Sequence, residues 1–348
     1  MPRCAHPLAL RTDAFVITRR KFIGACTAGA AILASGARAQ PAAGKVVRIG
    51  ILTMRAPDRS DAMNLQLLQG LRDHGYVEGR NLEIMFPDAQ GRQERLPGLA
   101  ADLVRSRVDM ILVVGAPALA PARNATKTIP IVMVASSADP VADGIAASLA
   151  RPGANVTGLT YAEPDRFKKQ LEFLKSTAGS VTRLSVLWDF DLASYRRDWK
   201  TPLESAGRAL GIEIIEPAVV RMPDDLPVAF AALRRRKVDA LHVAAGGMLW
   251  AQRDRVSALA LEQRLPGIAA FREYAHAGLL MSYGPDLADI NRRAGSFVDR
   301  IAKGAKPGDL PIELPAKFDL AINQKTAKAL GIVVPQPMLM RATEVIET

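Results

Sequence analysis

Histidine and cysteine, which often catalyse reactions or bind metals, are scarce in this sequence. The 348 residues include four histidines and two cysteines, and no histidine has an acidic partner at the spacing of a known catalytic motif. The phosphate-binding loop, the zinc-protease pattern His-Glu-x-x-His and the hydrolase pattern Gly-x-Ser-x-Gly do not occur in the sequence. The sequence therefore predicts no catalytic centre and no cofactor, and it favours a binding protein over an enzyme.

Two charged clusters have a functional and a structural interpretation. Asp189 and Asp191 could hold a metal ion, but they follow an apolar run, where Asp189 could equally cap the next helix. We expect no metal there. The basic run at 234–237 ends a predicted helix, where the helix dipole favours cations. Because no aromatic residues are interleaved with it, we expect no nucleic acid partner.

Residues 1–39 are predicted to be a signal peptide. Residues 18–23 read Thr-Arg-Arg-Lys-Phe-Ile, a twin-arginine pattern, an alanine-rich apolar run follows at 23–34, and Ala-Arg-Ala at 37–39 is a cleavage site of the small-x-small type. This order indicates export to the periplasm by the twin-arginine route. Cys26, in Ile-Gly-Ala-Cys, faintly resembles a lipid attachment site, an alternative that would tether the protein.

Cleavage of the predicted signal peptide would remove both cysteines and part of the positive charge from the chain. Both cysteines, Cys4 and Cys26, lie in that peptide, so the mature protein would contain no disulfide, thiolate ligand or cysteine nucleophile. Of the net charge of +11, about half belongs to the leader. The remaining positive balance favours anionic partners only weakly.

Beyond the leader, apolar strands alternate with amphipathic helices in two series. In the first, strands are predicted at 46–53, 81–86, 110–115 and 131–134, with helices at 64–74, 92–107 and 118–126 and a short helix starting at Asp139-Pro140. In the second, strands are predicted at 184–188, 212–215, 239–245 and 267–271, with helices at 163–178, 194–210, 224–237 and 248–265. A tail adds a strand at 278–284, a helix at 287–302, an extended stretch at 312–322 and a helix at 324–330. Such alternation predicts two parallel sheets covered by helices, hence an α/β protein of two lobes.

A ligand site is expected where the carboxyl ends of the strands meet, because open α/β sheets bind ligands there. In the first half these positions are Thr53, Met54, Gly115, Ala116, Pro117, Ala118, Ser136, Ser137 and Asp139. In the second half they are Trp188, Asp189, Gly246, Gly247 and Phe271, while Tyr161 and Tyr283 lie at passages between the halves. Asp139 could instead only cap a turn or helix, and Trp188 and Phe271 could instead belong to the core.

Several stretches, in this order, resemble one family. They are Gly-Tyr-Val-Glu-Gly-Arg-Asn at 75–81, Thr-Ile-Pro-Ile-Val at 128–132, Asp-Pro-Val at 139–141, Ser-Leu-Ala-Arg-Pro-Gly-Ala-Asn-Val-Thr-Gly at 148–158, Gly-Leu-Leu-Met-Ser-Tyr-Gly-Pro at 278–285, Lys-Phe-Asp-Leu at 317–320 and Lys-Thr-Ala-Lys-Ala-Leu-Gly at 325–331. Over nearly all of the mature chain, the sequence resembles the TrpX-like periplasmic substrate-binding proteins of ABC transporters.

The resemblance implies a type I periplasmic-binding-protein fold, in which two Rossmann-like, doubly wound lobes are joined by three crossings. Lobe one would comprise 45–160 and 284–306, and lobe two 161–283 and 309–348. The implied function is capture of a small organic ligand, an amino acid or an aromatic or apolar solute, by hinge closure and its delivery to an ABC permease. We expect a monomer.

The resemblance is incomplete at three candidate positions. Ala116 stands where relatives usually have Thr, Gly246-Gly247 where they often have Asp-Pro, and Trp188-Asp189 where Phe or Tyr followed by Asn is usual. The ligand therefore stays open. A periplasmic sensor for a receptor kinase and, less favoured, a periplasmic α/β enzyme are the alternatives.

Overall fold

The computed structural model describes residues 46–54, 62–162, 165–189, 195, 199–244 and 246–347. The predicted signal peptide lies outside these residues. Val46–Thr348 forms one unit of the chain. Among the described residues, no helix combines the length and the apolar character that crossing a membrane requires.

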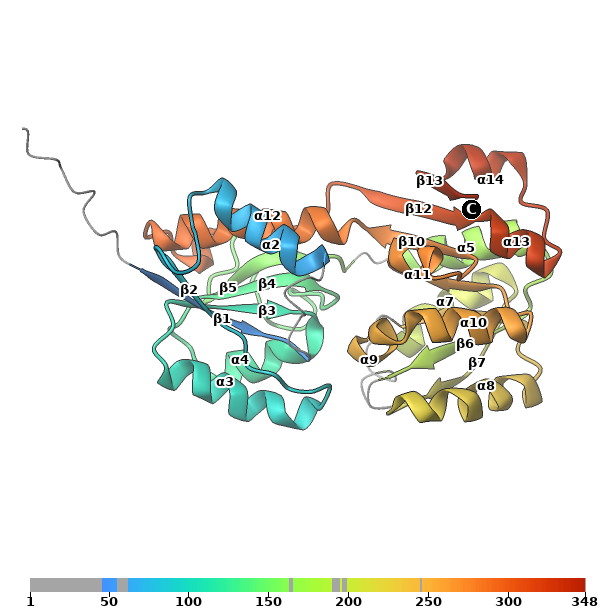
Figure 1. The fold of residues 1–348 in the computed structure, drawn as a ribbon, viewed down its shortest axis with the longest axis horizontal. Coiled ribbons are helices and arrows are strands. Elements are labelled where there is room, and N and C mark those ends of the chain that lie inside the picture. Colours follow the sequence, from blue (N-terminus) through green and yellow to red (C-terminus); the bar gives the residue numbers. More distant parts are fainter. Residues whose placement is uncertain are drawn as a thin grey trace, which may run out of the picture. The chain divides into compact units, whose positions relative to one another are not determined.

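The first sheet contains six strands, all paired in parallel (Figure 1). Their order is β11 (Ile312–Glu313), β5 (Val156–Thr160), β4 (Ile131–Ser136), β3 (Met110–Val114), β1 (Val47–Leu52) and β2 (Leu82–Met85). Every residue of β4 and β5 is buried. Central parallel strands are covered on both faces, which explains the nearly continuous apolar runs of β3 and β4.

Two pairs of helices pack on the first sheet. One pair is α3 (Leu96–Arg105) and α4 (Leu119–Ala125), preceded by the short turns η1 (Gln93–Arg95) and η2 (Ala116–Ala118). The other is α2 (Ala62–Asp73) and α12 (Leu287–Ala302). The helices of the second pair approach each other so closely that only glycine fits at two positions. A Cβ atom on Gly70 would overlap the carbonyl oxygen of Arg292, and one on Gly295 would overlap the backbone of Gly70.

The second sheet contains seven strands (Figure 1). Their order is β13 (Glu344–Ile346), β12 (Phe318–Asn323), β10 (Met281–Pro285), β9 (Gly267–Ala269), β8 (Ala240–Val243), β6 (Arg183–Trp188) and β7 (Glu213–Val219). Only the β10–β12 pairing is antiparallel among these described strands. The sequence alternation thus predicted the parallel character of both sheets correctly.

The helices of the second sheet form two groups. In one, α5 (Arg166–Ala178) contacts α7 (Lys200–Leu210) and α14 (Gln336–Arg341). In the other, α10 (Arg253–Glu262) contacts α8 (Leu226–Arg235), α9 (Gly247–Ala251), α11 (Arg272–His276) and α13 (Gln324–Leu330). The short turns η4 (Pro223–Asp225) and η5 (Pro307–Asp309) complete the described elements.

The chain passes between the sheets three times. It leaves the first sheet after β5, returns after β10 through α12, which packs on α2, and leaves again between β11 and β12. Strand β11 pairs with β5, although we expected all of 309–348 to accompany the second sheet. The extended stretch 312–322 is thus divided between the two sheets, and its first two residues belong to the first.

Two helix predictions also need correction. After Asp139-Pro140 the chain forms a series of turns and no helix before β5. Asp139 accepts hydrogen bonds from the backbone N–H groups of Val141 and Ala142. The same hydrogen bonds would cap a helix, but here they stabilise a turn. The helix predicted at 248–265 is two helices, α9 and α10, separated at Gln252.

Candidate functional site

The strand ends of the first sheet are shaped mainly by backbone contacts. Thr53 forms an isolated bridge to Asp88, and the carbonyl of Met54 accepts the Gly91 N–H at 2.7 Å. Gly115, at φ +80°, begins η2 and donates its N–H to the Val134 carbonyl at 3.1 Å. That φ favours glycine, and it turns the chain into Ala116, Pro117 and Ala118, of which Ala118 is fully buried.

The end of β4 is irregular where the candidate serines begin. Ala135 has φ +50° and the β4–β5 register shifts between Met133 and Ser136. Residues other than glycine seldom adopt this conformation, and such outliers concentrate at functional sites. Buried Ser136 accepts the Ala138 N–H on its hydroxyl and the Tyr161 N–H on its carbonyl, whereas Asp139 is exposed and caps the following turn.

Tyr161 connects the first sheet to aromatic residues of the second. Its hydroxyl hydrogen-bonds the Ser137 side chain, and burial raises the pKa of that hydroxyl although the nearby Arg166 guanidinium opposes the rise. The Tyr161 ring meets the Phe271 ring edge-on, with centroids 5.6 Å apart. Arg166 also lies over the Tyr161 ring, with its guanidinium carbon 5.3 Å from the ring centroid.

Two further rings, Trp250 and Tyr274, extend this contact. We call Tyr161, Phe271, Trp250 and Tyr274 the aromatic group. Trp250 contacts Phe271 at 5.8 Å and Tyr274 at 6.0 Å, both edge-on. Trp250 is partly exposed, while Tyr274 is fully buried. Neither residue was predicted for the site, because both lie inside helices, where an aromatic residue is normally assigned to the core.

Asp189 holds the start of α9 beside the aromatic group. Its Oδ2 accepts the backbone N–H of Met248 at 3.1 Å and of Leu249 at 3.0 Å. Its Oδ1 is buried with no hydrogen-bond partner among the described residues. Burial raises the pKa of this carboxyl to about 6, although the two N–H donors act in the opposite direction.

The two glycines after β8 make this arrangement possible. A Cβ atom on Gly246 would overlap the Asp189 carboxylate, so a residue with a side chain could not stand there without displacing it. A Cβ atom built on Gly247 would lie 3.4 Å from the Cβ of Met54, an ordinary van der Waals contact. Gly247 and Met54, predicted to lie at strand ends of different sheets, are therefore neighbours.

The ring contacts of Trp188 and Tyr283 are with residues outside the aromatic group. Trp188 is 2% exposed and packs edge-on against Tyr195 and Trp199, the core position we considered as its alternative. Tyr283 contacts Phe173 at 4.9 Å and Phe318 at 5.7 Å, both in elements of the second sheet. The structure thus brings together Ser137, Tyr161, Phe271, Asp189 and the Gly246-Gly247 pair, and does not bring these two rings into ring contact with that group.

A buried polar chain runs behind the site. The Gln170 side chain donates to the Tyr283 carbonyl at 2.8 Å, and its Oε1 is 2.8 Å from His242 Nε2. Burial lowers the pKa of His242 to about 3, and the Arg166 charge acts in the same direction. Because its pKa is low, His242 is neutral and only a weak base near neutral pH, and its bond to the Gln170 amide gives it a structural role.

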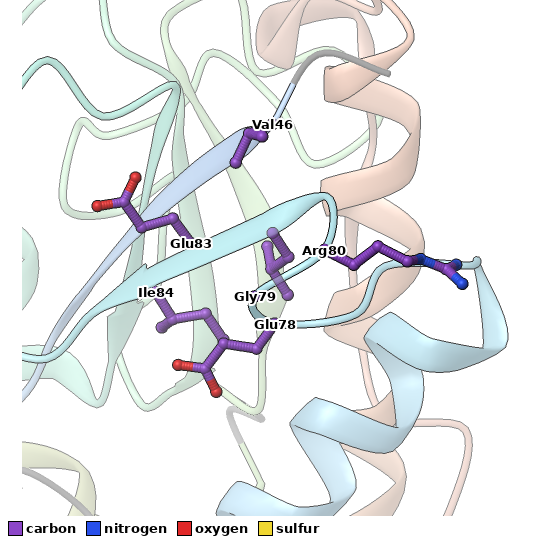
Figure 2. Close-up of a pocket in the computed structure, with 7 residues that line it drawn as sticks. Val46, Glu78, Gly79, Arg80, Glu83 and Ile84 are labelled. Carbon is purple, nitrogen blue, oxygen red and sulfur yellow. The ribbon is translucent and has the colours of Figure 1, made fainter. Parts of the chain in front are cut away.

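Two surface depressions of the described part are lined by residues other than these. One of about 390 Å³ is lined by Val46, Glu78, Gly79, Arg80, Leu82, Glu83 and Ile84 beside edge strand β2. Figure 2 shows the Glu78, Arg80 and Glu83 side chains pointing in different directions, and Glu83 pairs with Arg48 at 3.0 Å. This depression has no convergent set of binding groups. Among the described residues there is also no cluster of three or more metal-ligating side chains.

Residues 48–346 match the family of ABC transporter substrate binding proteins. The chain belongs to this family.

Individual relatives agree with this assignment. The substrate-binding protein is 28% identical over 289 residues to the tyrosine-binding protein of Clostridioides difficile strain R20291, covering 83% of this chain and 82% of the relative. A conserved domain protein of Vibrio cholerae is 28% identical with a TM-score of 0.77, covering 86% of this chain and 100% of that one. The ABC domain of Streptococcus pneumoniae, solved in complex with L-Trp, is 24% identical with a TM-score of 0.75, covering 86% and 99%.

The family and its structures confirm the type I periplasmic-binding-protein fold implied by the sequence motifs. The TrpX-like resemblance is likewise confirmed. The substrate-binding protein carries the two parallel-dominated sheets of that fold, and its aromatic group lies where the chain first passes from one sheet to the other.

One prediction concerns the buried ring of the aromatic group. The Tyr274 hydroxyl has no hydrogen-bond partner among the described residues, and burial raises its pKa well above the usual value. Removing an unpaired buried hydroxyl relieves its desolvation, so Tyr274→Phe should raise the free energy of unfolding by about 1 kcal/mol. Urea unfolding at neutral pH measures this. A destabilised variant would mean that the hydroxyl has a partner outside the described residues.

Proposed function

We propose that this protein is the extracytoplasmic solute receptor of an ABC importer and that it binds a small aromatic solute, with tyrosine and related amino acids as the first candidates. The family match over residues 48–346 carries the receptor role. The name of the tyrosine-binding relative supports an aromatic ligand. Export of the mature chain, by the twin-arginine route, and a partner permease belong to the same proposal.

The ligand would bind between two lobes built around the two sheets. Lobe one would contain 45–160, 284–306 and the β11 residues, and lobe two 161–283 with the chain from β12 onward. The contact between Gly247 and Met54 supports a site that uses both sheets. Contacts to both lobes favour the closed arrangement by their differential affinity, which is how a solute would drive closure about the three crossings.

Within the site, the aromatic group would supply the flat apolar surface. Trp250 is the partly exposed member, and aromatic pairs placed edge-on contribute about 0.5–1.5 kcal/mol beyond the area that they bury. Ser137 and the backbone N–H groups of η2 would contact polar parts of the solute. The remaining predicted residues, Thr53, Asp139, Trp188 and Tyr283 among them, stay predictions as ligand contacts.

Native mass spectrometry of the mature chain, purified without unfolding, should reveal a small molecule bound one-to-one. Isothermal titration with tyrosine, tryptophan, phenylalanine and aromatic acids would then rank the ligands. Trp250→Ala should weaken binding about tenfold or more, because loss of a central aromatic contact commonly costs at least 1.4 kcal/mol.

Phe173→Ala is the matched control. Phe173 is also a partly exposed aromatic residue of the second sheet's helices, but it packs on Tyr283 and not on the aromatic group. The Phe173→Ala variant should bind the ligand with the affinity of the unmodified protein. Equal affinity of both variants would place the site elsewhere, and a protein that binds nothing in the panel and retains no molecule would refute the receptor role.

A further inference from the structure

Two consecutive residues, Phe271 and Arg272, contact all three passages between the sheets. Phe271 packs on Tyr161, which immediately follows β5 at the first crossing. Arg272 Nη2 lies 2.6 Å from Oδ1 of Asp286, at the second crossing between β10 and α12. Arg272 Nη1 lies 4.0 Å from Oδ2 of Asp319, in β12 just after the third crossing.

Asp286 has two roles at once. The same Oδ1 that pairs with Arg272 accepts the N–H groups of Ala288 at 2.8 Å and Asp289 at 3.3 Å, so it caps α12. Helix α12 then packs along α2 on the first sheet. The ion pair therefore joins a helix start on the second sheet to the first turn of the helix that returns to the other sheet.

The strands next to the cluster of Arg272, Asp286 and Asp319 pack closely against one another. A Cβ atom on Gly284 would overlap the Ala270 carbonyl oxygen, so the end of β9 and β10 approach closely just before the second crossing. Gly284 is paired with Asp319 across the antiparallel β10–β12 ladder. Backbone contacts therefore connect the strand ends at the second and third crossings.

The charges around Arg272 are predominantly acidic. Asp286 and Asp319 are 29% and 20% exposed at their side chains and Arg272 is 33% exposed. Glu273, whose pKa is raised by burial, also adjoins the cluster. Pairs that are only partly exposed are screened by salt but contribute more than fully exposed ones.

We propose that Arg272 is a positioning residue for solute capture: by pairing with both Asp286 and Asp319 it fixes the second and third crossings, and through the adjacent Phe271 it links them to the aromatic group at the first. The role in capture rests on the proposed receptor function. A solute that moves Phe271 thereby acts on all three crossings together, which makes lobe closure a single concerted step.

The first test needs no ligand. In Arg272→Gln, hydrogen exchange should accelerate about threefold or more at the amides of 286–289, 314 and 316–319, because both ion pairs are lost. Arg292→Gln is the matched control, since Arg292 lies on α12 and pairs with Asp73 at 2.8 Å without contacting a crossing. Exchange at the crossings that is unchanged in Arg272→Gln would overturn the proposal, whether or not a ligand is known.

The second test uses the tightest amino acid from the titration panel. Affinity of the unmodified protein should change about threefold between about 50 mM and about 500 mM salt, and Arg272→Gln should lose this dependence. The variant should also show a smaller ligand-induced change in radius of gyration, while Arg272→Lys should recover part of both effects. If Arg272→Gln keeps the salt dependence and the full change in radius, Arg272 has no positioning role even though the receptor function stands.

Discussion

Replacing Asp189 by asparagine is expected to make the folded protein more stable at neutral pH. Burial raises the pKa of the Asp189 carboxyl from 3.8 to about 6 in the folded protein. The folded state therefore binds a proton more tightly than the unfolded chain, which means that ionising this carboxyl disfavours folding. An amide has no charge to desolvate, and its oxygen can still accept the N–H groups of Met248 and Leu249.

The pH dependence has a definite sign. Below about pH 3 the carboxyl is protonated in both states and contributes no difference. As the pH rises from about 4 through about 6, the unfolded chain loses its proton first and the folded protein loses stability. Each pKa unit corresponds to about 1.4 kcal/mol, so the advantage of Asp189→Asn should grow over this window to about 2–3 kcal/mol and then stay constant above it.

Urea unfolding of both proteins at a series of pH values between about 4 and 8 measures this difference. Asp139→Asn is the matched control, because Asp139 also accepts two backbone N–H bonds but is exposed. It should be neutral or slightly destabilising throughout. A constant difference between Asp189→Asn and the unmodified protein at every pH would mean that Asp189 is not destabilised by burial.

The second large effect is expected at the contact between α2 and α12. Gly70→Ala places a methyl group against the Arg292 carbonyl oxygen, and Gly295→Ala does the same against the backbone of Gly70. A backbone atom cannot rotate away, so the helices have to separate. Each change should lower the free energy of unfolding by about 1–3 kcal/mol, in spite of the better helix propensity of alanine.

Gly98→Ala is the control for the higher helix propensity of alanine. Gly98 lies in α3 with no atom within 4 Å of the added carbon, so alanine there should stabilise the protein by about 0.5–1 kcal/mol. Thermal and urea unfolding of the three variants compare the two environments directly. Should Gly70→Ala be as stable as Gly98→Ala, the close approach of α2 and α12 would be wrong.

The sequence predicted the elements whose burial pattern is simple. Strand β3, and β4 up to Ala135, are apolar because both faces are covered. Helix α12 was delimited correctly at 287–302 because its apolar positions recur with helical spacing. Strand β11 was missed as a separate element of the first sheet. Two residues, Ile312 and Glu313, carry no periodicity, and only their pairing with β5 defines them.

The errors near the site have a common physical origin. Asp139-Pro140 suggested a helix because the same side-chain acceptor and fixed proline φ serve helix starts and tight turns alike. Trp250 and Tyr274 escaped notice because helical spacing cannot distinguish a ring in the core from one next to a binding surface. Asp189 was predicted as a possible cap of the next helix along the chain, but it accepts the N–H groups of Met248 and Leu249 at the start of α9 instead. That contact, and an Oδ1 without a hydrogen-bond partner among the described residues, depend on the position of Gly246, which only the folded chain defines.

The division of the chain between two sheets also affects how the protein is made. The first sheet lacks its last strand until β11, at residues 312–313, has left the ribosome, and the second is closed only by β13 at 344–346. At about 5–20 residues per second, synthesis of the roughly 150 residues between β5 and β11 leaves the edge of β5 uncovered for about 8–30 seconds. Unpaired strand edges recruit other chains, so we expect the edge of β5 to be open to non-native pairing during translation.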